Sequence, residues 1–499
     1  MAGALTRRYF LKTAGAAVAT ALAPVRWAWA DADPFVRLDA TAQAELVRAG
    51  EVTPLELVDA AIARIERLNP VLNAFVTTCF DRAREQARGA LPDGPFRGVP
   101  YAIKDLSDYQ GTRATMGSRL FEDNISKRSN GIVERALEAG LVILGKTNTP
   151  EFGLLSTTES ELLGPARNPW NLEHSTGGSS GGAAAAVASG MLPCAQASDG
   201  GGSIRIPSSA CGVFGLKPSR GRIFRTSEAL PGDIAVRFGV SRTVRDSARL
   251  LAASELRDAP ALAPVGFVEG PSTRRLRIGF ATVNAKGEAA DPEVQHALEA
   301  TAMLCEALGH TVVEAALEID GDEFEHHFLS VWASLPARLE ANAWLIGLTQ
   351  LRWVGAEDVL EPWTRGLAKL HEERGADSVA QAVAYFQQIA QAYDRFFEQH
   401  DIQLTPVLRE PPIRLGEQAP GVPFEALLAE VVSYASHTPP QNAAGTPAMS
   451  VPLSLSSAGL PIGSQFTAQR GGERSLLELA YELEQAQPWA DRWPPDSAL

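Results

Sequence analysis

The chain has 499 residues, 45% of them hydrophobic, and a formal net charge of −14. The excess of acidic side chains argues against a nucleic-acid partner, since phosphate binding requires clustered lysine and arginine. No stretch holds about 18 uncharged apolar residues in succession, so we expect no membrane span. A chain of this length can bury a large core, and large α/β enzymes often form one extended domain.

The N-terminus has the features of an export signal. The paired arginines Arg7-Arg8 precede an uncharged, mildly apolar segment (13–25), and Ala28-Trp29-Ala30 matches a signal-peptidase site. This pattern resembles a twin-arginine signal, which carries folded proteins. We therefore expect residues 1–30 to be a signal peptide and the mature protein, 31–499, to be periplasmic or secreted. A basic N-terminal helix of the mature fold is the alternative.

Cysteines are few for this length, and none shows the paired spacing of a zinc site. The sequence does not assign disulfides among Cys79, Cys194, Cys211 and Cys305. Because Cys194 and Cys211 flank a glycine-rich turn, we expect both to be small buried residues. We expect neither a metal nor an organic cofactor.

The first regular elements are helices. A helical pattern begins at Ala40, and a second helix starts at Thr53-Pro54, a capping threonine followed by proline, with Glu56 three positions after the cap. Its apolar residues share one face, which indicates ordinary core, and Asn69-Pro70 is expected to end it. The sequence next predicts a polar helix at 81–88, a helix at 131–139 and an apolar strand at 141–144.

Residues 98–105 (GVPYAIKD) predict a short buried strand that ends on the charged pair Lys104-Asp105. Lysine in this position is unusual, because a buried ammonium is costly unless it is paired or neutral. A partly exposed charge at the strand end is the ordinary alternative to a catalytic amine. Lys146-Thr147 hints at a phosphate loop, but the upstream glycine of that motif is missing, and we reject this interpretation.

Two glycine-serine loops, 177–182 (GGSSGG) and 200–203 (GGGS), are separated by an alanine-rich helix at 183–188 and a short apolar run. Glycines permit positive φ angles and allow backbone N–H groups to converge on one point. Ser203, at the end of the second loop, is therefore a candidate nucleophile with an oxyanion hole of its own.

The rest of the chain alternates helices with apolar strands, which indicates an α/β fold. Residues 320–400 predict long helices rich in aromatic side chains. These are either core beneath a helical layer or, as a group, the apolar wall of a substrate pocket. The other predicted elements are a tight loop at 215–221, helices at 241–251, 291–308 and 473–486, and strands at 276–281, 402–407, 448–455 and 461–467.

A serine nucleophile needs a proton acceptor. Histidine is the familiar acceptor, but none of the eight histidines is tied to Ser203 by a motif, and the G-x-S-x-G elbow is absent there. A histidine triad therefore stays open but unsupported. Lysine is the alternative, because burial can lower its pKa until the amine is neutral. Lys104, at the end of an apolar strand, is placed for such tuning.

Five motifs, in this order, closely resemble the amidase signature family, over roughly residues 39–488. They are Ala102–Asp105 (AIKD), Gly177–Gly182 (GGSSGG), Asp199–Pro207 (DGGGSIRIP), Cys211–Pro218 (CGVFGLKP) and Asn442–Ala448 (NAAGTPA). The resemblance implies a single large domain whose mixed, twisted central sheet is covered by helices, with residues 320–400 as a helical layer on the substrate side. Segments 148–151 and 167–171 look most like the bacterial branch that includes 6-aminohexanoate cyclic-dimer hydrolases and aryl acylamidases.

The resemblance also implies a Ser-cisSer-Lys triad. Ser203 would attack the amide carbonyl, and Ser179, after a cis peptide from Gly178, would relay the proton to neutral Lys104. The backbone N–H groups of Gly200, Gly201, Gly202 and Ser203 would hold the oxyanion. Ser180, Asp199 and Arg205 would fix the loops.

The sequence therefore predicts an exported serine amidohydrolase that cleaves small, fairly apolar carboxamides through an acyl-enzyme on Ser203. One alternative is the amidase subunit of the tRNA-dependent amidotransferase, which shares the motifs but works in the cytoplasm with partner subunits. Another is a non-catalytic binding protein that kept the fold. The substrate's identity does not follow from the motifs, and the oligomeric state, with a homodimer among the options, stays open.

Overall fold

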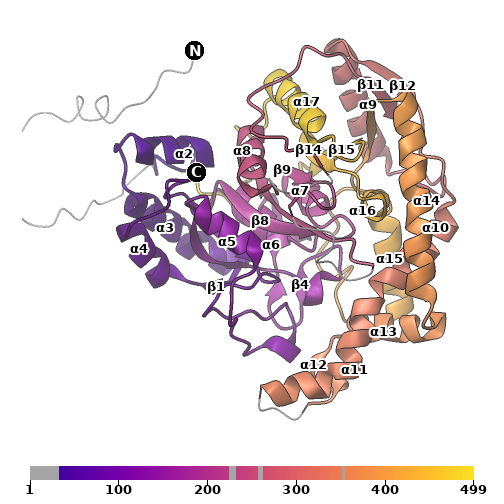
Figure 1. Cartoon of the computed structure of the whole chain (residues 1–499), viewed down its shortest axis with the longest axis horizontal. Coiled ribbons are helices and arrows are strands. Elements are labelled where there is room, and N and C mark those ends of the chain that lie inside the picture. Colours follow the sequence, from indigo (N-terminus) through magenta and orange to yellow (C-terminus); the bar gives the residue numbers. More distant parts are fainter. Residues whose placement is uncertain (1–32, 224–231, 257–261, 351–353) are drawn as a thin grey trace, which may run out of the picture.

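The computed structural model describes residues 33–223, 232–256, 262–350 and 354–499. The proposed signal peptide (1–30) lies outside the described residues. The N-terminal part holds a three-stranded sheet of order β1-β3-β2 with helices around it (Figure 1). Its elements are α2 (Ala40–Arg48), α3 (Pro54–Leu72), β1 (Phe75–Thr78), α4 (Phe80–Arg88), β2 (Pro100–Lys104), α5 (Gly131–Glu138) and β3 (Val142–Thr147).

An eight-stranded sheet forms the centre of the molecule, in the order β12-β11-β13-β15-β14-β9-β10-β8. Strands β11–β12 and β11–β13 pair in parallel and the other neighbours are antiparallel, so the sheet is mixed, as predicted. The strands are β8 (Cys194–Asp199), β9 (Phe214–Lys217), β10 (Val236–Ser241), β11 (Arg277–Phe280), β12 (Thr311–Glu314), β13 (Ile402–Pro406), β14 (Ala448–Leu455) and β15 (Pro461–Ala468).

Helices cover this sheet and extend to one side of it, where α10 to α14 form the predicted helical layer (Figure 1). The layer comprises α10 (Gly321–Trp332), α11 (Ser334–Thr349), α12 (Ala356–Val359), α13 (Pro362–Arg374) and α14 (Ser378–Gln399). The remaining helices are α6 (Gly181–Ala188), α7 (Arg205–Cys211), α8 (Val244–Ser254), α9 (Pro292–Ala307), α15 (Phe424–Tyr434), α16 (Pro439–Ala444) and α17 (Glu473–Ala486).

Short elements connect these larger ones. Two 3₁₀ turns, η1 (Arg119–Phe121) and η2 (Glu151–Gly153), follow β2 and β3 respectively. Two small antiparallel ribbons precede α6: β4 (Glu159–Ser160) with β5 (Gly164–Pro165), and β6 (Arg167–Asn168) with β7 (Asn171–Ser175).

The two sheets share one hydrophobic core. β2 lies beside β8, and the side chain of Gln196 in β8 accepts a hydrogen bond from the Lys104 backbone N–H at 2.8 Å. Ile103 of β2, Leu216 of β9 and Leu404 of β13 belong to the same cluster of buried apolar side chains. This contact matters for function, because it brings the end of β2 against the end of β8.

The aromatic residues of 320–400 were predicted to form either core beneath a helical layer or the wall of a substrate pocket. Most belong to two clusters beneath the helical layer, where Phe324, Trp363, Tyr385, Phe386 and Tyr393 are buried and Phe328, Trp332 and Phe397 are partly buried against them. Trp344 on α11 is instead exposed, and Trp353 lies outside the described residues. The interpretation as core therefore holds for most of them.

The local predictions failed at identifiable places. α3 runs through Pro70 to Leu72 and ends where Asn73 adopts a left-handed conformation (φ 48°), with its N–H bonded to the Asn69 carbonyl. Part of the predicted loop at 215–221 is strand β9, whose residues are buried and paired with β10 and β14. The predicted helix at 241–251 begins only at Val244, after strand β10.

All four cysteines lie among the described residues and are free thiols. Cys194 and Cys211 are buried, as predicted, and burial raises the pKa of both thiols. Among the described helices, none combines the length and the apolar character needed to cross a membrane.

A buried ion pair ties the start of α17 to the chain that leaves β9. Glu473 accepts hydrogen bonds from Arg222 at 3.0 and 2.8 Å and from the Ser219 N–H at 2.9 Å. Both side chains are almost completely buried. We expect Glu473→Ala to lower the free energy of unfolding by about 3 kcal/mol, because it leaves the buried Arg222 guanidinium without the carboxylate that accepts its hydrogen bonds. Thermal unfolding measures the loss.

Glu373→Ala is the matched control, since its ion pair with Lys369 is exposed and spans 3.8 Å. Exposed pairs of this kind contribute about 0–1 kcal/mol. Equal melting temperatures for the two variants would contradict the role given to Glu473.

Candidate active site

The Lys104 side chain ends among hydroxyl groups in the interior. Its Nζ lies 2.7 Å from Ser179 Oγ and 3.2 Å from Ser198 Oγ, and the residue has no exposed surface. Burial holds the pKa of Lys104 well below its ordinary value, and the charge of Asp199 opposes this shift only in part. The structure thus contradicts the interpretation of Lys104 as an exposed strand-end charge and favours a neutral amine.

The first glycine-serine loop presents Ser179 to this amine. The Gly178–Ser179 peptide is cis, as the resemblance implied. A Cβ on Gly178 would lie 2.2 Å from the Thr157 carbonyl oxygen, so only glycine fits against that neighbouring backbone. The neighbouring Ser180 hydroxyl instead donates to the Ser198 carbonyl at 3.2 Å and accepts from the Ser198 N–H at 3.3 Å. Ser180 therefore joins the loop to the end of β8.

The second loop is organised by Asp199. One carboxylate oxygen accepts the Gly202 N–H at 2.8 Å and the other accepts the Ile204 N–H at 3.1 Å. Arg205 donates to both oxygens, at 3.0 and 2.9 Å. Burial alone would raise the pKa of Asp199, but the Arg205 guanidinium lowers it to about 2. Asp199 is therefore a carboxylate that shapes the loop around it.

This arrangement reduces the number of backbone N–H groups that are available for the predicted oxyanion hole. The Gly202 N–H is already bonded to Asp199 and points at that carboxylate. In the described part of the chain, the N–H groups of Gly200, Gly201 and Ser203 have no hydrogen-bond acceptor. Three of the four predicted amides are thus free to receive an oxyanion, whereas Gly202 is not. Ser203 itself is nearly buried and lies just before α7.

Side chains from distant parts of the sequence hold Arg205. Its Nη1 donates to Gln441 and Gln465, both at 2.8 Å, and its Nη2 donates to Asn442 at 2.6 Å. Asn442 lies in a predicted motif, but no pattern in the sequence pointed to either glutamine. A buried guanidinium needs several acceptors, and that requirement is the one indication that such partners exist.

Aromatic rings of the helical layer cover the second loop. A Cβ on Gly200 would lie 3.3 Å from the ring of Trp332, and one on Gly201 would lie 3.0 Å from the ring of Phe328. The two rings stack with their centroids 5.5 Å apart. At these two positions of α10 the aromatic residues form an apolar wall beside the free amides.

The layer is attached to the first loop through η2 and the residue after it. Glu151 accepts hydrogen bonds from Ser118 at 2.6 Å, from the Glu361 N–H at 3.0 Å and from the Thr364 hydroxyl, so it caps the start of α13. The Leu154 carbonyl accepts the indole N–H groups of Trp332 and Trp363. In the same turn, a Cβ on Gly153 would lie 3.0 Å from Ser179 Oγ.

No histidine is placed to accept a proton from Ser203. All eight lie among the described residues, and none of them is hydrogen-bonded to Ser203. Burial lowers the pKa of His437 to about 3, so this imidazole is neutral. In the described ranges, no three side chains of the metal-ligating types gather closely enough to hold a metal ion.

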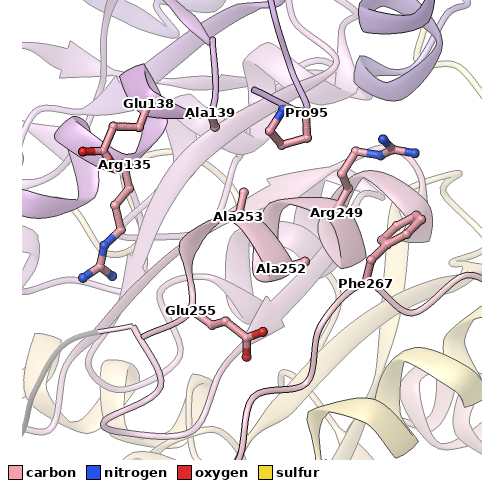
Figure 2. A pocket seen from close by; sticks show the side chains of 9 residues that line it. All are labelled: Pro95, Arg135, Glu138, Ala139, Arg249, Ala252, Ala253, Glu255 and Phe267. Atoms are coloured by element: carbon pink, nitrogen blue, oxygen red, sulfur yellow. The ribbon is translucent and has the colours of Figure 1, made fainter. Parts of the chain in front are cut away.

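An open depression lies away from these loops, lined by residues of α5 and α8 together with Pro95 and Phe267 (Figure 2). Three of the four charged side chains that line it, Arg135, Arg249 and Glu255, already contact other parts of the protein. The Arg249 guanidinium lies 4.7 Å from the Phe267 ring, and Glu255 accepts the Val265 and Gly266 N–H groups at 2.8 Å. The lining of this depression contains none of the predicted site residues.

Comparison with known proteins agrees with this geometry. A family model described as Amidase matches residues 56–477. The 6-aminohexanoate-cyclic-dimer hydrolase of Pseudomonas sp. (strain NK87) is 39% identical over 485 residues, covering 91% of this chain and 96% of that protein.

Two solved structures are similar over nearly their whole length. A structure of 6-aminohexanoate cyclic dimer hydrolase superposes with a TM-score of 0.85 and 35% identity, covering 93% of this chain and 100% of that one. A bacterial aryl acylamidase of the amidase signature family gives a TM-score of 0.81 and 25% identity, covering 92% and 99%.

Proposed function

Because the chain belongs to the amidase family and is a hydrolase of carbon–nitrogen amide bonds, we propose that it cleaves small, largely apolar carboxamides through an acyl-enzyme on Ser203. The observation that carries this proposal is the 2.7 Å contact between the buried Lys104 amine and the Ser179 hydroxyl. A neutral amine in a site with little water can accept the proton of the serine hydroxyl beside it.

In the proposed reaction, Ser203 Oγ attacks the amide carbonyl carbon. Its proton passes to Ser179, and the Ser179 proton passes to Lys104, which becomes an ammonium ion. The negative oxygen of the intermediate is received by the free N–H groups of Gly200, Gly201 and Ser203. The C–N bond then breaks, and the leaving nitrogen takes a proton back through the relay. Water repeats the attack on the ester, which releases the acid and restores Ser203.

The preference for apolar substrates rests on the wall formed by Phe328 and Trp332. Both rings lie against the glycines of the loop that would hold the oxyanion, so a substrate carbonyl bound there places its substituents beside aromatic carbon. Such pockets gain affinity from apolar burial and take orientation from a few polar groups. The proposal therefore covers aryl, aliphatic and cyclic amides without a charge near the carbonyl.

We expect Ser203→Ala to lower kcat at least about a thousandfold, because it removes the proposed nucleophile. Hydrolysis of an aryl amide with a chromogenic amine provides the measurement. Ser189→Ala is the matched control, since Ser189 is another buried serine, at the end of α6, whose hydroxyl makes only a long hydrogen bond to the Ala186 carbonyl among the described residues. A Ser203→Ala enzyme within tenfold of the wild type would overturn the assignment.

The rate should depend on pH through Lys104. The pKa of this amine is lowered by burial, so the neutral, proton-accepting form exists above that pKa and is lost as pH falls through it. We expect kcat/KM to decline on the acid side while circular dichroism shows an intact fold. A flat profile from neutral to acid pH in the folded enzyme would contradict a lysine base.

A second buried lysine could imitate this profile, because burial lowers the pKa of Lys217 to about 7. Lys217→Met separates the two, and the decline should persist in this variant. Its disappearance there would assign the titration to Lys217 instead.

We also propose that residues 1–30 direct export through the twin-arginine route, on the sequence pattern alone. Replacing both arginines, Arg7→Lys with Arg8→Lys, should leave the protein in the cytoplasm, as fractionation and immunoblotting would detect. Arg26→Lys, which keeps the pair, is the control and should export normally. Undiminished export of the double variant would refute the signal.

A further inference from the structure

Side chains of the segment around α16 donate hydrogen bonds to backbone carbonyl groups of the second glycine loop and of Asp199 before it. The side-chain amide of Asn442 donates to the Asp199 carbonyl at 3.0 Å, and the Thr438 hydroxyl donates to the Gly201 carbonyl at 2.5 Å. Asn442 also accepts from Arg205, as does Gln441. One short segment therefore contacts the loop at alternate carbonyls and at the arginine that fixes Asp199.

The peptide unit between Gly201 and Gly202 is held at both ends. Thr438 bonds its carbonyl, and Asp199 accepts its N–H at 2.8 Å. Because a peptide unit is planar, fixing both ends fixes the orientation of the whole plane. The N–H groups of Gly201 and Ser203 belong to the peptide units directly before and after this one.

Such external support is needed, since three of the four residues of the loop are glycines and have no side chain that could restrain it. Gly202 has a φ of 135°, which L side chains rarely adopt, and glycine loses more conformational freedom on ordering than any other residue. Thr438 also fills the space where a side chain would stand: a Cβ on Gly202 would lie 2.2 Å from its Oγ1 and 2.8 Å from its Cβ.

We propose that Thr438 is a positioning residue for amide hydrolysis. Its hydroxyl orients the 201–202 peptide so that the Gly201 and Ser203 N–H groups on either side converge on the oxyanion. The inference rests on the proposed function, which gives those amides that role. Thr438 touches neither the substrate nor a reacting atom in this scheme and acts through the loop.

The hydroxyl, rather than the bulk of the side chain, carries the effect. Thr438 Oγ1 has a second acceptor in the Ala435 carbonyl, but that contact is long, at 3.3 Å. Valine keeps the shape of threonine and removes the donor, whereas serine keeps the donor and removes a methyl group. The two substitutions therefore separate hydrogen bonding from packing.

We expect Thr438→Val to lower kcat about 10- to 100-fold with KM changed less than threefold, because loss of a whole oxyanion donor costs about 10²–10³ in kcat and misorientation costs less. Thr438→Ser should recover most of kcat. Thr446→Val is the matched control, since its buried hydroxyl has no hydrogen-bond partner among the described residues. Melting temperatures of the three variants report on folding.

Ser203→Ala, assayed beside them, separates the two proposals. An inactive Ser203→Ala with a fully active Thr438→Val overturns the positioning role and leaves the proposed function standing. Equal losses of kcat in Thr438→Val and Thr438→Ser would point to packing, and a rise in KM alone would point to uniform substrate binding, so either result also overturns it. Retained activity in Ser203→Ala overturns the proposed function and this inference together.

Discussion

The burial of one amine without a carboxylate beside it is the constraint on which the site depends. Two other buried cations have acid partners: Lys146 lies 3.5 Å from Asp105, and Arg205 lies 2.9 Å from Asp199. In the described chain Lys104 has only the hydroxyls of Ser179 and Ser198. A hydroxyl can accept from an ammonium or donate to a neutral amine, so these partners accommodate both forms while burial favours the neutral one.

Lys217 shows why the partners matter as much as the burial. It too is buried and forms no ion pair among the described residues, and burial lowers its pKa to about 7. Its Nζ, however, contacts the Pro218 carbonyl at 3.3 Å, and a carbonyl can only accept. Such a partner supports the ammonium form but cannot donate to a free lone pair. Lys104 therefore suits proton transfer, and Lys217 does not.

The sequence predicted what local patterns encode. The apolar run before Lys104 marked β2, and α17 was placed at its observed bounds, because alternation and helical periodicity are properties of neighbouring residues. β9 was missed because its glycine and the following Pro218 resemble a loop, while its pairing comes from β10 and β14. The roles of Thr438 and Gln465 had no local signal, since only the folded chain brings residues of β15 and the start of α16 to the loop after β8.

The backbone polar groups of the second glycine loop fall into two sets, those with a hydrogen-bond partner and those without one. Its carbonyls at Asp199 and Gly201 face donors from Asn442 and Thr438, while the amides of Gly202 and Ile204 are bonded to the Asp199 carboxylate. What stays unsatisfied in the described chain is a set of donors, the amides of Gly200, Gly201 and Ser203. Where a bound substrate excludes water from these amides, an N–H without an acceptor costs about 1–3 kcal/mol, and in the proposed reaction the oxyanion would remove that cost. In the proposed reaction, the charge that forms during amide cleavage would complete the loop, and the carbonyl contacts would keep its amides from turning to another acceptor.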